Sequence, residues 1–328
     1  MEVVADEIDH PWSLNFAPDG RLFFTSRDTG VINTLDVEHG ALTALRGLPR
    51  IRTGGEAGLL GMALDPDFAR TGWLYVCFSY TSAGNALNRL SRFTLTGTTL
   101  GEEKVLLDAL PGSIYHNGCR VLFGPDGLLY ASMGDAQDSE RAQSPAFLGG
   151  KVFRILPDGA IPAGNPFGNS PIWTVGHRNP QGLAFNPVTG ALWSTEHGPD
   201  TRDEVNILLP GKNYGWPTCQ GTQAPCPAVK DYMPAVAQFD DNATIAISDL
   251  VFYTGQAFPA WRSHLFFVSL KTGRLYHAVT DGDRLLSSEI LIDNAHGRLR
   301  DIAVGPDGFL YFSTDATLGQ ILRLRPAP

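Results

Sequence analysis

A histidine at the entrance of a predicted strand is the first candidate for chemistry. His116 lies between Tyr115 and Arg120, and an apolar run that is typical of a β-strand follows at residues 121–123. Because an imidazole titrates near neutral pH, a histidine held on such a loop can act as a general base. The alternative is a histidine with a purely structural role.

A second segment, residues 176–182, places polar donors before another predicted strand. It contains Arg178 and Asn179 among turn-forming residues. The planar guanidinium of arginine suits a carboxylate or an oxygen on which negative charge develops. The alternative is an ordinary ion pair between Arg178 and an acidic neighbour in a turn.

Basic residues recur in two later loops, although Lys and Arg number 25 against 34 Asp and Glu, a net charge of −9. Lys271 and Thr272 follow one predicted hairpin, and Arg298 and Arg300 precede the next. Residues two apart in an extended chain point to the same side. Together with Arg178, these groups could converge on a polyanionic small molecule. The alternative is a set of salt-bridged surface arginines.

Oxygen-rich residues cluster further along the chain. Residues 196–200 are followed by Asp203, Glu204, Asn206 and later Tyr214. Calcium takes six to eight hard oxygen ligands, including backbone carbonyls, so such a segment suits this ion. The spacing matches no EF-hand, and a solvated acidic loop is the alternative.

The elements that must position these segments form a repeat. An apolar strand, a turn with Pro and usually Asp-Gly, and a second apolar strand recur six times, the fifth time without the proline. The turn prolines are Pro18, Pro66, Pro125, Pro187 and Pro306. Proline presets φ, Asp bonds its own backbone and Gly supplies positive φ, so each copy predicts a β-hairpin. Six copies predict an all-β fold: a six-bladed β-propeller of four-stranded antiparallel sheets, in one domain spanning residues 1–328. A pair of β-sandwiches is the alternative.

Composition agrees with many turns and few helices. The 328 residues include 36 glycines and 23 prolines, and only 18% are charged, which excludes a disordered chain, a coiled coil and a helical bundle. One short helix is expected at residues 144–148. Apolar runs are short, so no segment is expected to span a membrane, and the acidic balance argues against a nucleic-acid binder. No leader pattern follows Met1, so we expect either a cytosolic protein or one whose leader has been removed.

The four cysteines bear on the compartment. Cys219 and Cys226 flank a short loop, and a disulfide between them would contribute about 2.5 kcal/mol. Such a bridge favours an oxidising compartment, whereas a reduced pair is the alternative. Cys77 lies in a strand-like run and is predicted to be a buried thiol, and Cys119 lies where a loop enters a strand.

In combination these segments resemble the soluble quinoprotein glucose/sorbosone dehydrogenase family, and most closely its bacterial aldose sugar dehydrogenase branch. The matching motifs span most of the chain: residues 11–14, 55–61, 115–120, 176–182, 196–199, 213–217 and 298–301. The resemblance implies a six-bladed propeller that binds pyrroloquinoline quinone (PQQ) over its central channel. Two departures are visible: Glu56 stands where relatives carry Gln, and Tyr115 stands where glucose-specific relatives carry an acid.

The resemblance also implies roles for individual residues. His116 matches the catalytic base, and the carbonyls of Gly198 and Pro199 match ligands of a calcium ion that polarises the quinone. Glu204 and Tyr214 resemble a second calcium site. The remaining matches are cofactor-binding positions: Glu56, Arg178, Asn179, Lys271, Thr272, Arg298 and Arg300. Among these, Arg178 would also take part in catalysis, and the negative charge of Glu56 would repel a tricarboxylate.

The implied reaction is oxidation of an aldose at its anomeric carbon. The anomeric hydroxyl loses its proton to His116 and hydride passes to the quinone, which yields a lactone and reduced PQQ for an external electron acceptor. We expect a monomer in the periplasm or secreted, with no nucleic-acid partner and no membrane span. The alternatives are a calcium-dependent propeller lactonase, which would not need the cationic residues, and a non-catalytic binding propeller.

Overall fold

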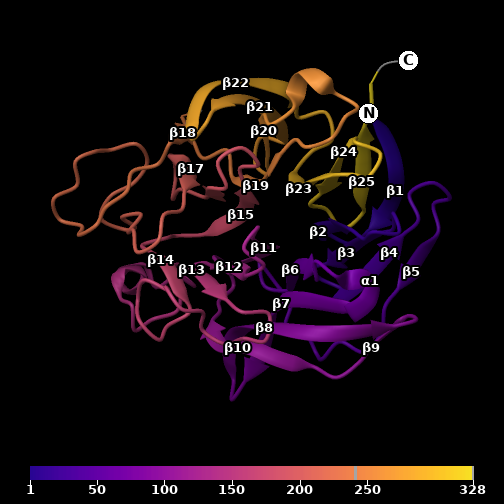
Figure 1. Cartoon of the computed structure of the whole chain (residues 1–328), viewed down its shortest axis with the longest axis horizontal. Helices are drawn as coiled ribbons and strands as arrows, with labels where there is room; N and C mark the ends of the chain where they lie inside the picture. Colours follow the sequence, from indigo (N-terminus) through magenta and orange to yellow (C-terminus); the bar gives the residue numbers. More distant parts are fainter. Residues whose placement is uncertain (240–241, 327–328) are drawn as a thin grey trace.

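The computed structural model describes residues 1–239 and 242–326. Within them, the strands form six antiparallel sheets arranged around a central axis (Figure 1). The predicted six-bladed β-propeller is therefore confirmed, and the pair of β-sandwiches is excluded. Each sheet has four principal strands that lie side by side, from the innermost at the axis to the outermost at the surface, and the second sheet carries one short extra strand.

The first three blades use the chain in sequence order. Their strands are β2 (Pro11–Phe16), β3 (Leu22–Ser26), β4 (Val31–Leu35) and β5 (Leu42–Ala44); β6 (Leu59–Leu64), β7 (Trp73–Ser82), β8 (Asn85–Thr96) and β10 (Lys104–Pro111), with β9 (Thr99–Leu100) beside β8; and β11 (Gly118–Phe123), β12 (Leu129–Met133), β13 (Lys151–Ile155) and β14 (Ile172–Val175).

The last three blades repeat the pattern, with one exchange at the end. Their strands are β15 (Pro180–Phe185), β16 (Leu192–Glu196), β17 (Asp203–Ile207) and β18 (Ala237–Phe239); β19 (Ile247–Phe252), β20 (Leu265–Ser269), β21 (Arg274–Asp281) and β22 (Arg284–Asp293); and β23 (Leu299–Val304), β24 (Leu310–Thr314), β25 (Gly319–Leu324) and β1 (Glu2–Ile8).

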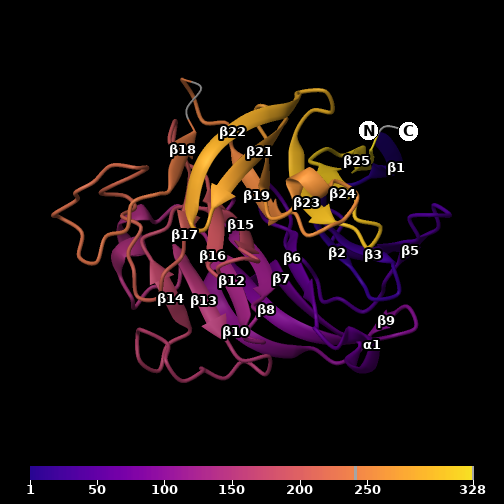
Figure 2. The same ribbon diagram turned by 45° about the horizontal axis from the view of Figure 1, so that its top comes forward.

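The ring is closed by the first strand of the chain. β1 pairs antiparallel with β25, so the sixth blade contains both the first and the last strand (Figure 2). The Glu2 carboxylate accepts a hydrogen bond from Arg323 Nη2 at 2.9 Å across this pair. Residues at the two ends of the chain thus complete one sheet, which ties the ring together.

The predicted hairpins are the first and second strands of each blade. Their turns gather at one end of the channel, where the residues around Pro18, Pro66, Pro125, Pro187 and Pro306 line two adjoining cavities. We call this the turn end. The loops that lead into the innermost strands, and those that leave the second strands, lie at the opposite end, which we call the site end.

Aromatic side chains pack neighbouring blades against each other. Ring pairs with edge-to-face geometry join blades two and three through Tyr75 and Phe123, with ring centroids 5.0 Å apart, and blades four and five through Trp193 and Phe252, 5.5 Å apart. Each such pair contributes about 0.5–1.5 kcal/mol beyond the burial of its area. Because the blades bury their apolar faces in this way, the loops at the channel ends can carry polar residues.

One prediction about the cysteines is confirmed and another is corrected. The predicted Cys219–Cys226 disulfide is present, but Cys77 is not a thiol, because it forms a disulfide with Cys119. Strands β7 and β11 of adjacent blades bring the two Cα atoms to 5.6 Å, a contact between distant segments that local patterning does not reveal.

The short helix expected at residues 144–148 is absent from that position. A 3-10 helix, η1 (Ser139–Gln143), ends just before it, because Pro145 disfavours helical backbone at Ser144. The other helical segments are α1 (Phe68–Thr71) and η2 (Pro259–Trp261). None of the helices in the described residues is long and apolar enough to cross a membrane.

Candidate active site

The predicted site residues converge around one buried imidazole at the site end. His197 follows β16, and its pKa is held well below the usual value, first by burial and then by neighbouring cationic groups. Those groups are the guanidinium groups of Arg300, Arg178 and Arg298, and His116 acts in the same direction when it is protonated. Four residues from three predicted loops therefore lie close enough to this imidazole for their charges to act on it.

His116 is held by a buried carboxylate. Its Nδ1 lies 2.8 Å from Oδ1 of Asp135, and Trp216 Nε1 donates to the other oxygen of Asp135 at 2.8 Å. Asp135 is only 1% exposed. A histidine that donates Nδ1–H to a carboxylate keeps the lone pair of Nε2 for a proton. The arrangement can therefore serve a general base.

The backbone around His116 is tightly constrained. His116 has φ of 60°, in the left-handed region that non-glycine residues seldom adopt. A Cβ atom at Gly134 would lie 2.0 Å from the His116 carbonyl oxygen, and that oxygen accepts a hydrogen bond from the Ala136 amide at 3.2 Å. The close approach of this glycine fixes the distance between the His116 loop and the segment that carries Asp135.

Two further side chains hold the same loop. Oε2 of Glu56 accepts hydrogen bonds from the His116 amide at 2.8 Å and from Asn179 Nδ2 at 3.2 Å. Oδ1 of Asn179 accepts a hydrogen bond from the Gly118 amide at 3.1 Å. Both residues were predicted as cofactor contacts, and in the structure these polar atoms bind the loop that carries the histidine.

Arg178 lies between His197 and Trp216. Its Nη1 donates to the His197 carbonyl at 3.3 Å, and its guanidinium lies over the Trp216 ring, 5.4 Å from the centroid. Burial lowers its pKa despite the nearby charges of Asp135 and Glu196. Nε is buried and has no hydrogen-bond partner among the described residues. An unpartnered cationic donor of this kind is suited to an anionic or polarised ligand.

Three arginines share one carboxylate beside this group. Arg27 Nη1 lies 3.0 Å from Asp315, Arg298 Nη2 3.0 Å and Arg300 Nη2 3.1 Å. Burial alone would raise the pKa of Asp315, but the three guanidinium groups hold it well below its usual range. Arg27 also pairs with Asp28, whereas Asp315 is the ion-pair partner found for both Arg298 and Arg300 among the described residues. These two cations share one negative charge, which suits a ligand that carries carboxylates.

Lys271 and Thr272 occupy the turn after β20. The Lys271 amide donates to the Ile245 carbonyl at 3.0 Å, and a Cβ atom at Gly273 would lie 2.4 Å from the Gly297 carbonyl oxygen. The turn therefore lies against the segment that leads to Arg298. The Lys271 side chain is exposed, and within the described residues it takes no part in the ion pairs of Asp315.

The oxygen-rich segment and Arg178 line a small gap of about 10 Å³. Gly198, Pro199, Glu204 and Tyr214 all contribute to its wall. Burial raises the pKa of Glu204 to about 8, and the negative charges of Glu196 and Asp203 add to the shift. Buried carboxylates that repel one another, next to the backbone carbonyls of Gly198 and Pro199, fit a hard cation such as Ca²⁺.

Tyr214 enters this wall with its hydroxyl already committed. That hydroxyl donates to the Ile207 carbonyl and accepts from the Leu209 amide at 2.9 Å, while the ring stacks on His177 with centroids 4.7 Å apart. Any ligand atom from Tyr214 would therefore have to be its backbone carbonyl oxygen.

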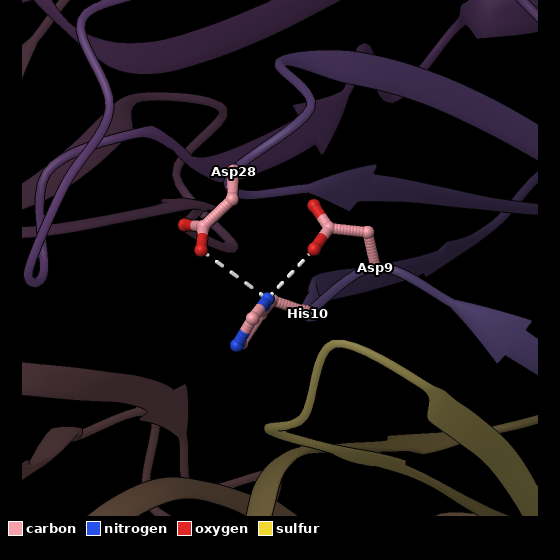
Figure 3. A group of neighbouring side chains, drawn as sticks. All are labelled: Asp9, His10 and Asp28. Carbon is pink, nitrogen blue, oxygen red and sulfur yellow. Dashed lines mark hydrogen bonds and ion pairs between the residues drawn. The ribbon is translucent and has the colours of Figure 1, made fainter.

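Asp9, His10 and Asp28 form a separate acid–histidine group (Figure 3). His10 Nδ1 lies 2.8 Å from Asp9 and 3.3 Å from Asp28. The remaining oxygens accept from protein donors: Asp28 Oδ1 from Arg27 Nε and Asp9 Oδ2 from the Thr29 amide, both at 2.8 Å. The group therefore anchors Arg27 to the loop that enters β2.

Comparison with known proteins places this geometry in a family. A sequence profile of the Glucose / Sorbosone dehydrogenase family matches residues 8–323. The chain belongs to this family. The aldose sugar dehydrogenase YliI of Escherichia coli (strain K12) is 32% identical over 345 residues, covering 99% of this chain and 92% of that protein. The resemblance found in the sequence is thereby confirmed.

Two other relatives of this sugar dehydrogenase family bear on the cofactor. Quinoprotein glucose dehydrogenase B of Acinetobacter calcoaceticus is 32% identical over 281 residues, which are 76% of this chain and 57% of that protein. The solved structure of the PQQ-bound form of aldose sugar dehydrogenase from Streptomyces coelicolor superimposes with a TM-score of 0.88 and 33% identity, covering 99% of this chain and 96% of that one.

Sequence reasoning missed several residues that hold this family member's site together. Arg27, Asp135, His197 and Asp315 were not selected, although each follows the second strand of its blade by one or two residues. In a propeller whose blades repeat, these positions all face the same end of the channel. A search for polar residues at that repeated position would have found them.

Proposed function

We propose that the protein is a PQQ-dependent aldose sugar dehydrogenase that oxidises the anomeric carbon of its substrate to a lactone. The observation that carries the proposal is the cluster of Arg27, Arg298 and Arg300 on the carboxylate of Asp315, beside the His116–Asp135 pair. A lactonase would have no need of this cluster. The PQQ-bound state of the Streptomyces coelicolor relative supports the choice of cofactor.

The residues present suit both PQQ and calcium. PQQ carries three carboxylates, and Arg298, Arg300 and Lys271 would hold them, with Thr272 in the same turn. The Gly198 and Pro199 carbonyls would bind the calcium ion at the quinone, and Glu204 with the Tyr214 carbonyl would bind a second ion. When bound, the quinone and its calcium ion supply an electrophile that accepts a hydride.

The chain itself supplies the proton chemistry. Nε2 of His116 takes the proton of the anomeric hydroxyl as the hydride leaves the anomeric carbon. Asp135 holds the ring in the required tautomer and stabilises the imidazolium that forms, as the carboxylate of other His–Asp pairs does. Trp216 fixes the second oxygen of Asp135. The proton thus ends on His116, and the substrate becomes a lactone.

Arg178 would stabilise negative charge on the acceptor side. Its buried guanidinium is preorganised by the His197 carbonyl and the Trp216 ring. In a site of low dielectric, a fixed cation stabilises developing charge more than it would in water. Turnover would then require an external electron acceptor.

The compartment follows from the disulfides. Both pairs of cysteines are bridged, and disulfides persist in oxidising environments. We therefore place the protein in the periplasm or outside the cell. We also propose that it is a monomeric enzyme of one domain.

Reconstitution tests the proposed function. The apo protein is mixed with PQQ and Ca²⁺, an aldose is added, and reduction of a redox dye is followed. Dye reduction that needs both PQQ and sugar is the expected result. Hydrolysis of a lactone without dye reduction would replace the proposal with a lactonase, and no response to either substrate would favour a binding module.

A further inference from the structure

We infer that Glu56 is a positioning residue of this site: it holds the backbone of His116 in place, and its charge weakens the hold of the arginine cluster on a tricarboxylate cofactor. The inference rests on the proposed function. It assigns to Glu56 a role toward PQQ that is opposite in sign to that of Arg298 and Arg300.

The turn that carries Glu56 packs directly on the His116 loop. The amide of Glu56 donates to the Ile114 carbonyl at 2.7 Å. A Cβ atom at Gly55 would lie 2.5 Å from the same carbonyl oxygen, so only glycine permits this approach. The two segments are therefore fixed to each other through the backbone before the side chain of Glu56 makes any contact.

The side chain then fixes the histidine itself. One oxygen of Glu56 accepts both the His116 amide and the Asn179 side-chain amide, at 2.8 and 3.2 Å. His116 sits at φ of 60°, a conformation that persists only where its surroundings hold it. The hydrogen bond from its own amide to Glu56 stabilises this conformation, and thus the direction in which the imidazole points.

The charge of Glu56 acts on the cofactor-binding cations. Its negative charge favours the protonated forms of Arg27, Arg178 and Arg300, and Glu56 lines one narrow gap together with Arg27 and Arg300. In a partly buried site the dielectric is lower than in water, so charges that line the same gap interact appreciably. Glu56 therefore subtracts from the positive potential that a carboxylate ligand experiences there.

Glutamine separates the two roles, because it keeps the shape and one acceptor oxygen but loses the charge. The variants are Glu56→Gln and Glu56→Ala, with Glu140→Gln as a matched control that removes an exposed acid of η1. Three quantities are measured: the Kd for PQQ in the presence of Ca²⁺ by optical titration at low and high salt, hydrogen exchange of the peptide covering residues 113–119, and kcat.

The expected outcome differs between the variants. E56Q binds PQQ on the order of tenfold more tightly than wild type at low salt, and the gain shrinks at high salt. E56A exchanges faster at residues 113–119 and loses on the order of tenfold or more in kcat, and E56Q recovers most of that rate and protection. E140Q matches wild type in PQQ affinity.

Other outcomes overturn the inference. E56Q that binds PQQ no more tightly than wild type removes the electrostatic role, and unchanged exchange in E56A removes the positioning role. If E56A fails to fold, the affinity of E56Q still decides the electrostatic role, and its exchange decides whether an uncharged acceptor suffices to hold the loop. Wild-type protein that does not bind PQQ overturns the proposed function itself.

Discussion

The two ends of the propeller channel differ in a way that separates cavity size from chemistry. The turn end opens into adjoining cavities of about 830 and 620 Å³, whereas the gaps at the site end measure only about 10 and 0 Å³. Yet the turn end is built from repeated turns and half-buried apolar side chains such as Phe16, Phe123 and Val304. Its buried charges, Arg120 with Asp249 and Asp301, pair with one another.

The site end has the opposite character. Non-glycine residues there adopt positive φ, including His116, Cys119, Ala136 and Gln137, and cations outnumber the carboxylate that they share at Asp315. Irregular backbone of this kind is costly and is held in place by surrounding contacts. The comparison shows that the regular hairpins form the ring and its turn end. The irregular loops at the site end hold the predicted site residues.

The largest expected effect separates the two ends by activity. His116→Ala should lower kcat by about two to four orders of magnitude, because the general base is lost. Thr254→Ala, an exposed residue that lines the turn-end cavity, should leave kcat within about twofold. Steady-state dye reduction on the reconstituted enzyme measures both. Equal losses of kcat in the two variants would contradict the functional difference between the two ends.

The second effect concerns how firmly the site end is tied to the ring. The Cys77–Cys119 bridge closes a loop with a sequence separation of 42, and the Cys219–Cys226 bridge one of 7. Loop entropy predicts a loss of about 4 kcal/mol for the Cys77→Ala/Cys119→Ala variant and about 2.5 kcal/mol for the Cys219→Ala/Cys226→Ala variant. Denaturant unfolding of the two double variants gives these values, and the reverse order would contradict the expectation.

The third effect is the pH dependence of stability that the buried Lys151 gives to the site end. Lys151 begins β13, and its ammonium donates to the Ala142 and Gly149 carbonyls at 2.7 and 2.8 Å. Burial lowers its pKa to about 7 from the usual 10.5. At pH values between these two pKa values, the unfolded chain binds more protons at Lys151 than the folded chain does. The free energy of unfolding of wild type must therefore rise with pH relative to that of Lys151→Met.

The rise should be about 1 kcal/mol per pH unit between pH 7 and 10. It is measured as the difference in free energy of unfolding between wild type and Lys151→Met, and Lys104→Met, at an exposed position in β10, serves as the control. Parallel pH profiles for wild type and Lys151→Met would show that burial does not perturb this lysine.

The smallest effect compares two surface arginines at opposite ends. Arg298 has a half-exposed side chain at the site end, and Arg21 pairs with Asp19 at a turn of the other end. Arg298→Ala should raise the Kd for PQQ about tenfold through the loss of one charge-assisted contact, whereas Arg21→Ala should leave it within twofold. An equal rise in the Kd for PQQ in both variants would show that only the net charge of the protein matters.

The fold was accessible from the sequence because its main signal is local. Each turn lies directly between its two apolar runs in the sequence, and five of the six turns carry a proline, so six copies predicted six blades. His116, Arg178, Arg298 and Arg300 were accessible for the same reason, since each lies next to an apolar run that enters the channel wall.

Other features depend on contacts between distant segments. Asp315 matters because Arg27 reaches it from the first blade, and Cys77 is bridged because β11 of the next blade brings Cys119 alongside. Closure of the ring by β1 likewise has no local signal. The function of Glu56 could not be read from its type, because its partner atom is the backbone amide of a residue 60 positions away.

A crystal structure of the protein soaked with PQQ and Ca²⁺ tests the central claim most directly. We expect density for the cofactor at the site end, with carboxylates on Arg298 and Arg300 and the quinone between His116 and Arg178. Density for PQQ in the larger turn-end cavity, with the arginine cluster still closed on Asp315, would contradict it.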